Sequence, residues 1–238
     1  MSNVVRLEVE HLSMKFGPVT AVNDVSFSVS GGEVVGLIGP NGAGKSTVVN
    51  CLSGVLKPSS GRVLLDNVEI QGWRASRVVS AGLARTFQHP RGFETMSVLE
   101  NLLVAADKAA DRNGVARGVA AQVGLEERLG VLVGGLSLSE RRRLEIARVL
   151  ATGSKLIMLD EVMAGLAEAE IEQLIPVITN LVDHGHGVLL VEHLVWVVSR
   201  VSTRIIVLDR GEVLASGSPA DVLADPSVVE AYLGQAIA

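Results

Sequence analysis

Aromatic side chains and cysteine are both scarce in this sequence. Aromatic residues make up 3% of the 238 residues, whereas hydrophobic residues make up 48%, so the core has to be built from Val, Leu, Ile and Ala. The single cysteine, Cys51, cannot form an internal disulfide, which argues against a small secreted scaffold and favours a cytosolic location. A hydrophobic content this high also excludes a mainly disordered chain.

Long uncharged apolar runs are missing as well. The most apolar region, 187–208, is interrupted by ionisable side chains, so no stretch of about 18 apolar residues is available to span a bilayer. The mean hydropathy is nevertheless high, at +0.39. We therefore expect strands buried on both faces, or a surface that meets something apolar. The alternating residues 1–16 predict a strand rather than a signal peptide.

No block of basic residues is present either. The chain has 21 Lys and Arg residues against 26 Asp and Glu residues, which gives a formal net charge of −5. A protein that grips nucleic-acid phosphates without regard to sequence needs a positive surface. We therefore expect no nucleic-acid partner.

What the sequence does contain is an alternation of strand-like and helix-like segments. Period-two alternation over Val4–Glu10 and Val25–Val29 predicts two strands. The short apolar run Glu33–Ile38 is followed by a glycine-rich loop and by helical spacing over Lys45–Gly54. A strand, a loop and a helix in this order open a parallel βα unit.

The second half of the chain continues this pattern. Short apolar runs predict buried strands at 155–159, 187–191 and 204–208, with helical segments at 140–151 and 167–183. Buried strands that alternate with helices indicate an α/β fold with a mostly parallel sheet covered on both faces.

Two segments lie outside this parallel core. Residues 63–70 predict a hairpin with Asp66-Asn67 at its turn, and so an antiparallel β patch beside the main sheet. From Ser97 to about Gly135 the sequence is alanine-rich and helical, and we expect glycines to break it into short pieces. These glycines are Gly114, Gly118, Gly124 and Gly130.

The strongest chemical signal is a phosphate-binding loop. The segment GPNGAGKST fits the pattern G-x-x-x-x-G-K-[ST] directly after a strand and at the start of a helix. Backbone N–H groups of such a loop converge on phosphate oxygens, and the helix dipole adds positive charge. Lys45 is expected to bridge the β- and γ-phosphates, and Ser46 to ligate Mg²⁺. The predicted phosphate contacts are Gly39, Pro40, Asn41, Gly42, Ala43, Gly44, Lys45, Ser46 and Thr47.

A pair of acidic residues follows the predicted strand at 155–159. Asp160 lies at the carboxyl end of that strand, where open α/β sheets bind ligands, and could hold Mg²⁺. Glu161 points elsewhere and could accept a proton from the attacking water. The same pair could cap a helix, but the phosphate loop upstream favours the catalytic interpretation.

Two further polar residues are weaker candidates when taken alone. The amide oxygen of Gln88 could complete the coordination of Mg²⁺, although a solvent-facing glutamine is the simpler interpretation. His193 follows a buried strand and could bond a γ-phosphate oxygen or orient the water, although it could also be an ordinary loop histidine.

Taken in order, these motifs resemble an ABC transporter ATP-binding subunit. They are GPNGAGKST, RTFQH, LSLSERRRLEIARVLA, IMLDE, AGL and VEH, and they are spread over almost the whole chain. The linking segments FGPVTAVNDVSFSV, NCLSG, RRRLEIAR and AYLGQA are similar to those of the branched-chain amino acid uptake subfamily. The resemblance implies a P-loop NTPase fold of the ABC ATPase type, with ATP and Mg²⁺ as its cofactors.

The resemblance also implies further nucleotide contacts. Phe16 takes the aromatic position that stacks on adenine, with Val22 beside it. Ser137 falls on the serine of the family's signature, which reaches across a head-to-tail dimer to the γ-phosphate held by the other subunit. The helix that follows aims its N-terminus at that anion.

The signature itself departs from the family pattern. Leu138, Ser139 and Glu140 stand where Gly, Gly and Gln are expected, so that Ser139 adds a side chain and Glu140 a carboxylate near phosphate. Val162 and Leu194 also replace a usual proline and a usual acid. In a heterodimer, this chain could complete its own site with the partner's signature and leave the partner's site weaker. The alternative is that Ser139 and Glu140 are tolerated variants.

From the resemblance we expect one ABC ATPase domain over 1–238. Its ATP-binding core, with the antiparallel patch, comprises about 1–96 and 154–238. A helical subdomain that carries the signature comprises about 97–153.

The implied function is hydrolysis of ATP to power import of a small solute, above all branched-chain or other hydrophobic amino acids. The implied partners are membrane permease subunits, a second ATP-binding subunit in a homo- or heterodimer, and a periplasmic or extracellular solute-binding protein. The chain would then lie at the cytoplasmic face of the membrane as a peripheral protein. Three alternatives stay open: another cargo such as urea or an amide, a non-transport ATP switch with a weakened signature, and a metabolite kinase.

Overall fold

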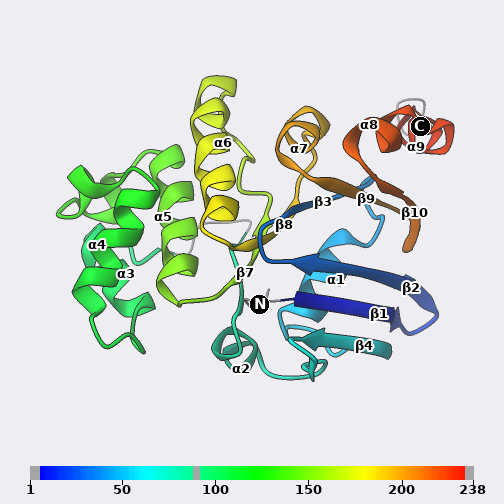
Figure 1. Cartoon of the computed structure of the whole chain (residues 1–238), viewed down its shortest axis with the longest axis horizontal. Coiled ribbons are helices and arrows are strands. Elements are labelled where there is room, and N and C mark those ends of the chain that lie inside the picture. The colour runs from blue at the N-terminus through cyan, green and yellow to red at the C-terminus, as the bar shows by residue number, and fades with distance from the viewer. Residues whose placement is uncertain (1–5, 88–91, 234–238) are drawn as a thin grey trace.

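The computed structural model describes residues 6–87 and 92–233, and its strands form two sheets flanked by helices (Figure 1). The larger sheet has six strands in the order β10-β9-β3-β8-β7-β6, and all neighbours are parallel except β10 and β9. The mostly parallel α/β sheet predicted from the sequence is therefore confirmed. Its strands are β3 (Val34–Ile38), β6 (Leu83–Arg85), β7 (Leu156–Asp160), β8 (Gly187–Val191), β9 (Arg204–Asp209) and β10 (Glu212–Gly217).

Successive side chains of the parallel strands point into two separate cores. In β7, Ile157 and Leu159 belong to one buried cluster, whereas Leu156 and Met158 belong to the other. This follows from the period of two along a strand. Every residue of β3, β7 and β8 is buried. The high mean hydropathy is explained in large part by this sheet, which is buried on both faces.

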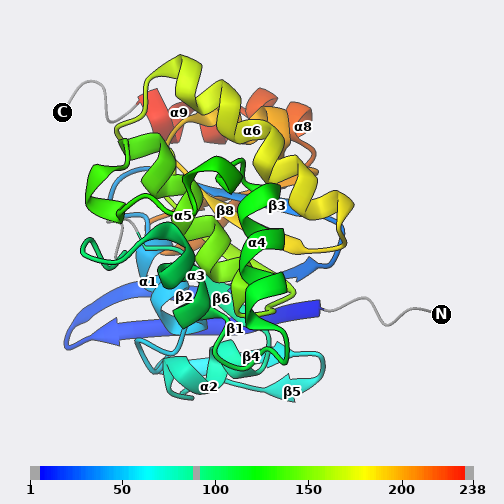
Figure 2. The ribbon, with the colours of Figure 1, turned by 90° about the vertical axis from the view of Figure 1, so that its left-hand side faces the viewer.

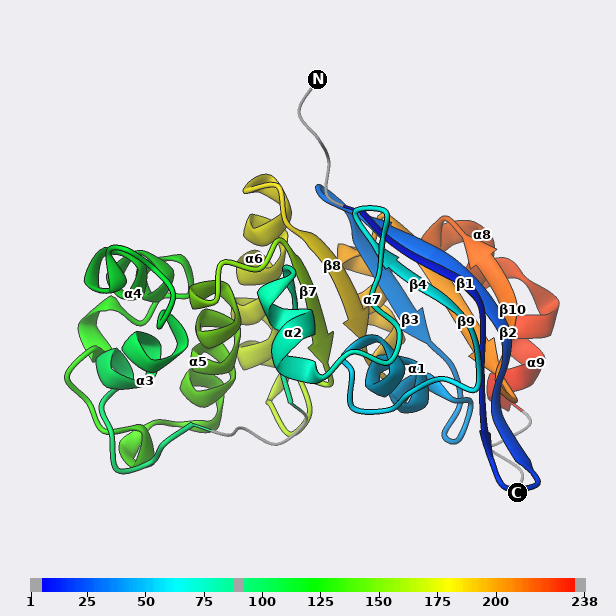
Figure 3. The ribbon, with the colours of Figure 1, turned by 90° about the horizontal axis from the view of Figure 1, so that it is seen from below.

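One face of the six-stranded sheet packs against helix α1 (Lys45–Leu52) and the smaller antiparallel sheet, as the view from below shows (Figure 3). The smaller sheet has the strand order β2-β1-β4-β5. The predicted hairpin is present, and Asp66 and Asn67 at its turn both have positive φ, at 49° and 65°, as a two-residue hairpin turn requires. The strands are β1 (Arg6–Phe16), β2 (Val19–Ser30), β4 (Ser60–Leu65) and β5 (Val68–Glu69).

The opposite face of the six-stranded sheet is covered by helices from the second half of the chain (Figure 1). These covering helices are α6 (Glu168–Asp183), α7 (Val195–Val201), α8 (Pro219–Ala224) and α9 (Pro226–Leu233).

In residues 6–87 and 92–233, no helix combines the length and the apolar character that crossing a membrane requires.

A group of helices lies at one end of the molecule, beyond the β6 edge of the sheet (Figures 1 and 2). It contains α3 (Val98–Ala105), α4 (Arg112–Gln122) and α5 (Leu138–Ala151), which pack on one another. Short 3₁₀ turns at Glu126–Arg128 and Val133–Gly135 join α4 to α5. Helix α2 (Ala75–Ser80) lies nearer the antiparallel sheet.

The prediction that glycines break this segment at four points is partly wrong. Gly114 and Gly118 lie inside α4. Asp111 caps the first turn by accepting the N–H of Gly114 at 2.8 Å, and α4 buries Ala116, Val119 and Ala120. Packing of this face outweighs a cost of about 1 kcal/mol for each glycine in a helix.

Candidate functional site

The phosphate loop joins the carboxyl end of β3 to the first turn of α1. Gly44 precedes the helix with φ at 103°, and a Cβ at this position would lie 2.6 Å from the carbonyl oxygen of Ala21. Only glycine fits this close approach in a left-handed conformation. No side chain caps the helix start, and its first turn carries no acidic residue. The first N–H groups of α1 are therefore left for an anion.

Lys45 is folded back onto the loop that precedes it. Its Nζ donates hydrogen bonds to the carbonyl oxygens of Gly39 at 2.6 Å and Pro40 at 2.9 Å, and the residue is buried. Burial lowers the pKa of Lys45, whereas the charges of Glu161 and Asp160 raise it. A phosphate group would offer the same ammonium a charged acceptor in place of two carbonyls.

A cleft of about 210 Å³ opens in front of the loop. It brings the loop together with Glu161 and His193, which follow β7 and β8, so three neighbouring strands deliver these residues at their carboxyl ends. The cleft is lined by Ala21, Asn41, Gly42, Ala43, Gly44, Lys45, Ser46, Thr47, Glu161 and His193.

Phe16 and Val22, the two residues expected near the adenine base, do not line the cleft of the phosphate loop. Phe16 ends β1 and is about half exposed, but it does not line the cleft. Val22 is fully buried beneath the loop, where a Cβ on Gly44 would lie 3.4 Å from its Cγ2. Val22 therefore supports the loop from below rather than offering a surface to a base. Adenine stacking on Phe16 stays a prediction.

Glu161 and His193 form a close pair at the cleft. The Nε2 atom of His193 lies 2.6 Å from Oε1 of Glu161. Glu161 is held with φ at 50°, a left-handed conformation that is costly for a residue with a side chain. Its N–H donates to Val191 O at 2.9 Å and its carbonyl accepts from Ala164 at 3.2 Å. The backbone thus fixes a carboxylate at a position where it can accept a proton.

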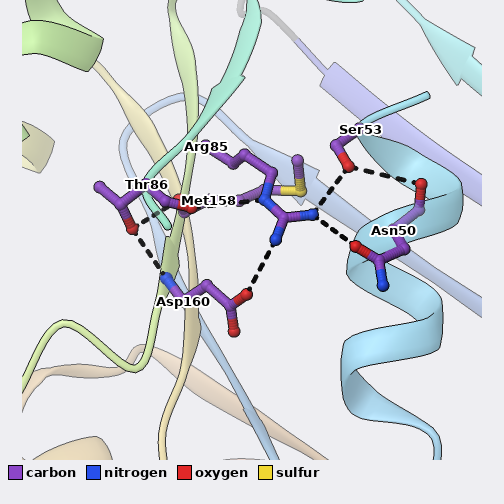
Figure 4. A network of polar contacts seen from close by, with 6 residues as sticks. All are labelled: Asn50, Ser53, Arg85, Thr86, Met158 and Asp160. Carbon is purple, nitrogen blue, oxygen red and sulfur yellow. Dashed lines mark hydrogen bonds and ion pairs between the residues drawn. The ribbon is translucent and has the colours of Figure 1, made fainter. Parts of the chain in front are cut away.

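Asp160 takes part in a network centred on Arg85 (Figure 4). The Arg85 guanidinium donates to Asp160 Oδ2 at 3.3 Å, and to Asn50 Oδ1 at 2.7 Å and Ser53 Oγ at 3.0 Å on α1. Burial raises the pKa of Asp160, and the positive charge of Arg85 opposes that rise. Arg85 therefore ties β6, β7 and α1 together around one carboxylate.

Sequence reasoning missed Arg85, although it lies in the RTFQH segment that suggested Gln88. Its partners Asp160, Asn50 and Ser53 are 32 to 75 positions away along the chain, so no local pattern identifies them. An arginine at the end of a short buried strand was the only available signal. Gln88 itself lies outside the described residues.

The donor set fits a magnesium ion that is shared with a nucleotide. Ser46 offers an exposed hydroxyl in the first turn of α1, and Asp160 offers a carboxylate near Lys45, and oxygen donors of this kind suit Mg²⁺. Within the part of the chain that the structure describes, no group of three or more His, Cys, Asp or Glu side chains is placed so that it could hold a metal ion. Phosphate oxygens and waters would have to supply the remaining ligands.

Glu192 is a second residue that sequence reasoning missed. It is buried between Val191 and His193, and its Oε1 accepts the N–H of Met163 at 2.9 Å. Burial raises the pKa of Glu192 to about 7. Its carboxyl thus ties the end of β8 to the segment that follows Glu161.

The signature segment closes on itself at the start of α5. The Oγ of Ser137 accepts the N–H of Glu140 at 3.2 Å, and Glu140 Oε2 accepts the N–H of Ser137 at 2.9 Å, which is a capping box. Glu140 also pairs with Arg128 at 2.8 Å. The Ser137 N–H and the charge of Arg128 lower the pKa of Glu140, although burial opposes them.

Two neighbouring signature residues, Leu138 and Ser139, also pack against other parts of this chain. Ser139 is buried, and Leu138 lies against Gly165, where a Cβ would be 3.2 Å from Leu138 Cδ2. None of Ser137, Ser139 and Glu140 lines the cleft of the phosphate loop. Their contact with a nucleotide across a dimer stays a prediction.

Comparison with known proteins is consistent with this geometry. A family model described as "ABC transporter" matches residues 22–164, and one described as "Branched-chain amino acid ATP-binding cassette transporter" matches residues 212–238. The chain is 40% identical to the high-affinity branched-chain amino acid transport ATP-binding protein BraF of Pseudomonas aeruginosa, over 97% of this chain and 98% of that protein.

A more distant relative and a solved structure are also similar to this chain, and both are named as ATP-binding components. The lipopolysaccharide export system ATP-binding protein LptB of Haemophilus influenzae is 32% identical over 96% of this chain and 97% of its own length. The crystal structure of the ADP conformation of MJ1267, an ATP-binding cassette of an ABC transporter, superposes with a TM-score of 0.88 at 31% identity and covers 97% of this chain and 99% of that one. The chain therefore belongs to the ATP-binding subunits of ABC transporters, of the branched-chain amino acid transport type, and is an ATP hydrolase.

Proposed function

We propose that this subunit powers the import of branched-chain or other hydrophobic amino acids. The observation that carries the proposal is the match of residues 212–238 to the branched-chain family, together with the likeness to BraF over nearly the full length. The likeness to LptB is weaker and accompanies a different cargo. Urea or an amide is the rival cargo for the same ATPase.

In the proposed reaction, a water attacks the γ-phosphate of ATP in line with the bond that breaks. Glu161 accepts the proton of that water, and His193 holds the Glu161 carboxylate at 2.6 Å in the orientation that this needs. Lys45 leaves its two carbonyl acceptors and binds the β- and γ-phosphates. Mg²⁺, when bound by Ser46, Asp160 and Gln88, would neutralise phosphate charge.

The proposed dimer would be closed by ATP and opened by hydrolysis. Two chains, or this chain and a related one, would meet head to tail so that Ser137 of each approaches the nucleotide of the other. Because Glu140 and Ser139 depart from the family pattern, the composite site that uses this chain's signature would be the weaker one.

A groove between the core and the α3–α5 helices is the proposed seat of the permease. It has a volume of about 260 Å³ and is lined mostly by apolar side chains of α2, β6 and α5, with Arg85 and Arg148 among them. A groove of this kind suits an amphipathic helix with a matching apolar face. Docking here would place the chain at the cytoplasmic face of the membrane. A solute-binding protein on the other side would complete the importer.

The test is an ATPase assay on the chain co-purified with its membrane partners in proteoliposomes. We expect leucine, isoleucine or valine, with the cognate binding protein, to stimulate ATP hydrolysis. Stimulation by urea or an amide but not by these amino acids would replace the cargo and leave the ATPase role intact. Failure to co-purify with any permease would favour a non-transport switch, which the close Glu161–His193 pair argues against.

A further inference from the structure

A buried arginine of α5 reaches from the signature helix to the segment that follows Glu161. Helix α5 is the member of its helical group that lies nearest the six-stranded sheet (Figures 1 and 3). Arg142 lies in the second turn of α5 and is buried, which is rare for an arginine. Its Nη2 donates to the carbonyl oxygen of Ala164 at 3.0 Å, across 22 positions of the chain.

The segment that Arg142 contacts is a tight turn over residues 161–166, between β7 and α6. The N–H of Ala164 donates to the carbonyl oxygen of Glu161 at 3.2 Å, and the N–H of Leu166 donates to the carbonyl oxygen of Met163 at 3.2 Å. Because each bond closes a turn of four residues, a displacement of Ala164 would be carried back to Glu161. The placement of the Glu161 carboxylate therefore depends on what holds Ala164.

Two ionisable side chains from different elements hold this 161–166 turn. Glu192 follows β8 and accepts the N–H of Met163 at 2.9 Å, and Arg142 binds the carbonyl of the next residue along the chain. Only 2% of Glu192 and 5% of Arg142 is exposed. Burying charged groups is costly, and apolar side chains in their place are often at least as stabilising. Stability alone therefore does not explain why both groups reach the backbone of this turn.

We propose that Arg142 is a positioning residue that fixes Glu161, through Ala164, where it accepts the proton of the attacking water. The inference rests on the proposed role of Glu161 as the proton acceptor. It gives the signature helix a task within its own subunit, besides the contact across a dimer. A small displacement of a reacting group lowers the rate of the chemical step, whereas residues 39–47 would still bind the nucleotide.

The test compares kcat and KM for Mg²⁺-dependent ATP hydrolysis in the full chain and in Arg142→Met. Methionine fills much of the same space but donates no hydrogen bond to Ala164. We expect kcat to fall about ten- to a hundredfold, while KM for ATP changes by less than about twofold. Arg142→Gln, whose side chain is shorter, should give the same pattern and replaces the methionine variant if thermal unfolding shows that the latter does not fold.

A double variant shows whether Arg142 acts through Glu161. In the Glu161→Gln background, Arg142→Met should leave the residual single-turnover rate unchanged, because the group that it positions is already lost. A further fall by the same factor would overturn the proposal. Arg143→Met is the matched control on the same helix: it removes a bond of 2.9 Å to Gln173 on α6 and should keep the parental kcat.

The outcomes separate this inference from the proposed reaction. Parental kcat in a folded Arg142 variant, beside a slow Glu161→Gln, would overturn the positioning role alone. A rise in KM at parental kcat would also overturn it, because Arg142 would then support binding. If Glu161→Gln kept the parental rate, the role of Glu161 as proton acceptor would fall, and the role of Arg142 with it.

Discussion

The N-termini of α1 and α5 are both expected to face phosphate, yet they are built in opposite ways. Helix α1 begins after Gly44 with no side-chain cap and no acid in its first turn. Helix α5 begins after Ser137 with a complete capping box and carries Glu140 in its first turn. The first helix leaves its N–H groups for a ligand, whereas the second satisfies one of them with its own side chain.

The difference shows that a helix N-terminus predicted from a motif to bind phosphate can instead be capped by the side chains of its own chain, as in α5. The Ser137 N–H and Arg128 lower the pKa of Glu140, so the N-terminus of α5 carries the negative charge of Glu140 at the place where the proposed dimer would bring a partner's phosphate. Arg128 balances part of that charge at 2.8 Å. The capping box is stabilising for the chain itself. In the proposed dimer, Glu140 would therefore stabilise α5 and at the same time weaken the binding of a partner's phosphate.

The largest expected change in ATPase rate concerns the phosphate-loop site at the N-terminus of α1. Glu161→Gln removes the proton acceptor and should lower the rate of ATP hydrolysis about 10³-fold, while ATP binding is kept. Phosphate release and nucleotide binding measure the two properties separately. Glu172→Gln on the surface of α6, which pairs with Arg200, is the control and should keep the parental rate. Loss of ATP binding in Glu161→Gln would contradict the assigned role.

Restoring the family signature should make the N-terminus of α5 a better phosphate contact, and so more like the N-terminus of α1. Ser139→Gly combined with Glu140→Gln should raise the ATPase rate of the assembled transporter, by up to about 10² if one phosphate contact is regained. A glutamine amide can still accept the Ser137 N–H, so the capping box is kept. The change removes the charge that pairs with Arg128 and lies in the first turn of α5, which should cost about 0.5 kcal/mol of stability in thermal unfolding. An unchanged ATPase rate would mean that the altered signature is simply tolerated.

Glu192 offers a test that depends on pH, because burial at the end of β8 raises its pKa. Its pKa is about 7 in the folded chain against an ordinary value of 4.5. The folded state thus binds the proton more tightly, and the stability that this contributes is present below about pH 4.5 and is lost as the pH rises through about 7. Glu192→Gln should remove about 2 to 3 kcal/mol of this pH dependence. Denaturant unfolding at pH 5 and pH 8 measures it, and parallel curves for both proteins would contradict the burial argument.

Arg85→Lys should have a smaller effect on the α1 side. A lysine carries the charge but cannot bond Asp160, Asn50 and Ser53 at once, as the planar fork of Arg85 does. We expect kcat/KM to fall about tenfold, the loss of about one charge-assisted hydrogen bond, and the Mg²⁺ concentration for half-maximal rate to rise. Arg77→Lys is the control, since Arg77 lies over the ring of Trp73 and a lysine can do the same. Equal rates for both variants would reduce Arg85 to a structural role.

The parts of the fold that could be predicted are those written in contiguous residues. The phosphate loop, the buried strands and the Asp66-Asn67 turn each carry a local pattern, and the structure has the loop and the turn at the predicted residues and the strands to within about one residue at each end. Gly114 and Gly118 misled the prediction because packing of α4 overrode their local preference. Strand β2 extends well beyond the predicted segment Val25–Val29 because its pairing with β1 prolongs it.

The parts of the site that could not be predicted depend on contacts between distant segments. Arg85 meets Asp160 across 75 positions, and Glu192 accepts the N–H of Met163 across 29 positions. The left-handed conformation of Glu161 likewise follows from the backbone bonds around it rather than from its neighbours in sequence. Such features need coordinates, because a linear pattern does not specify which segments meet.

The two cores of the six-stranded sheet have a consequence for how this protein can change over time. Adjacent residues such as Ile157 and Met158 face different clusters, so the packing partners of one differ from those of the other. The side that carries α1 and the antiparallel sheet can therefore stay constant while the side under α6, α7 and α8 diverges. Alternate residues of one strand can thus pack beneath the phosphate-loop site, where few substitutions are expected, and beneath the covering helices, where more are expected.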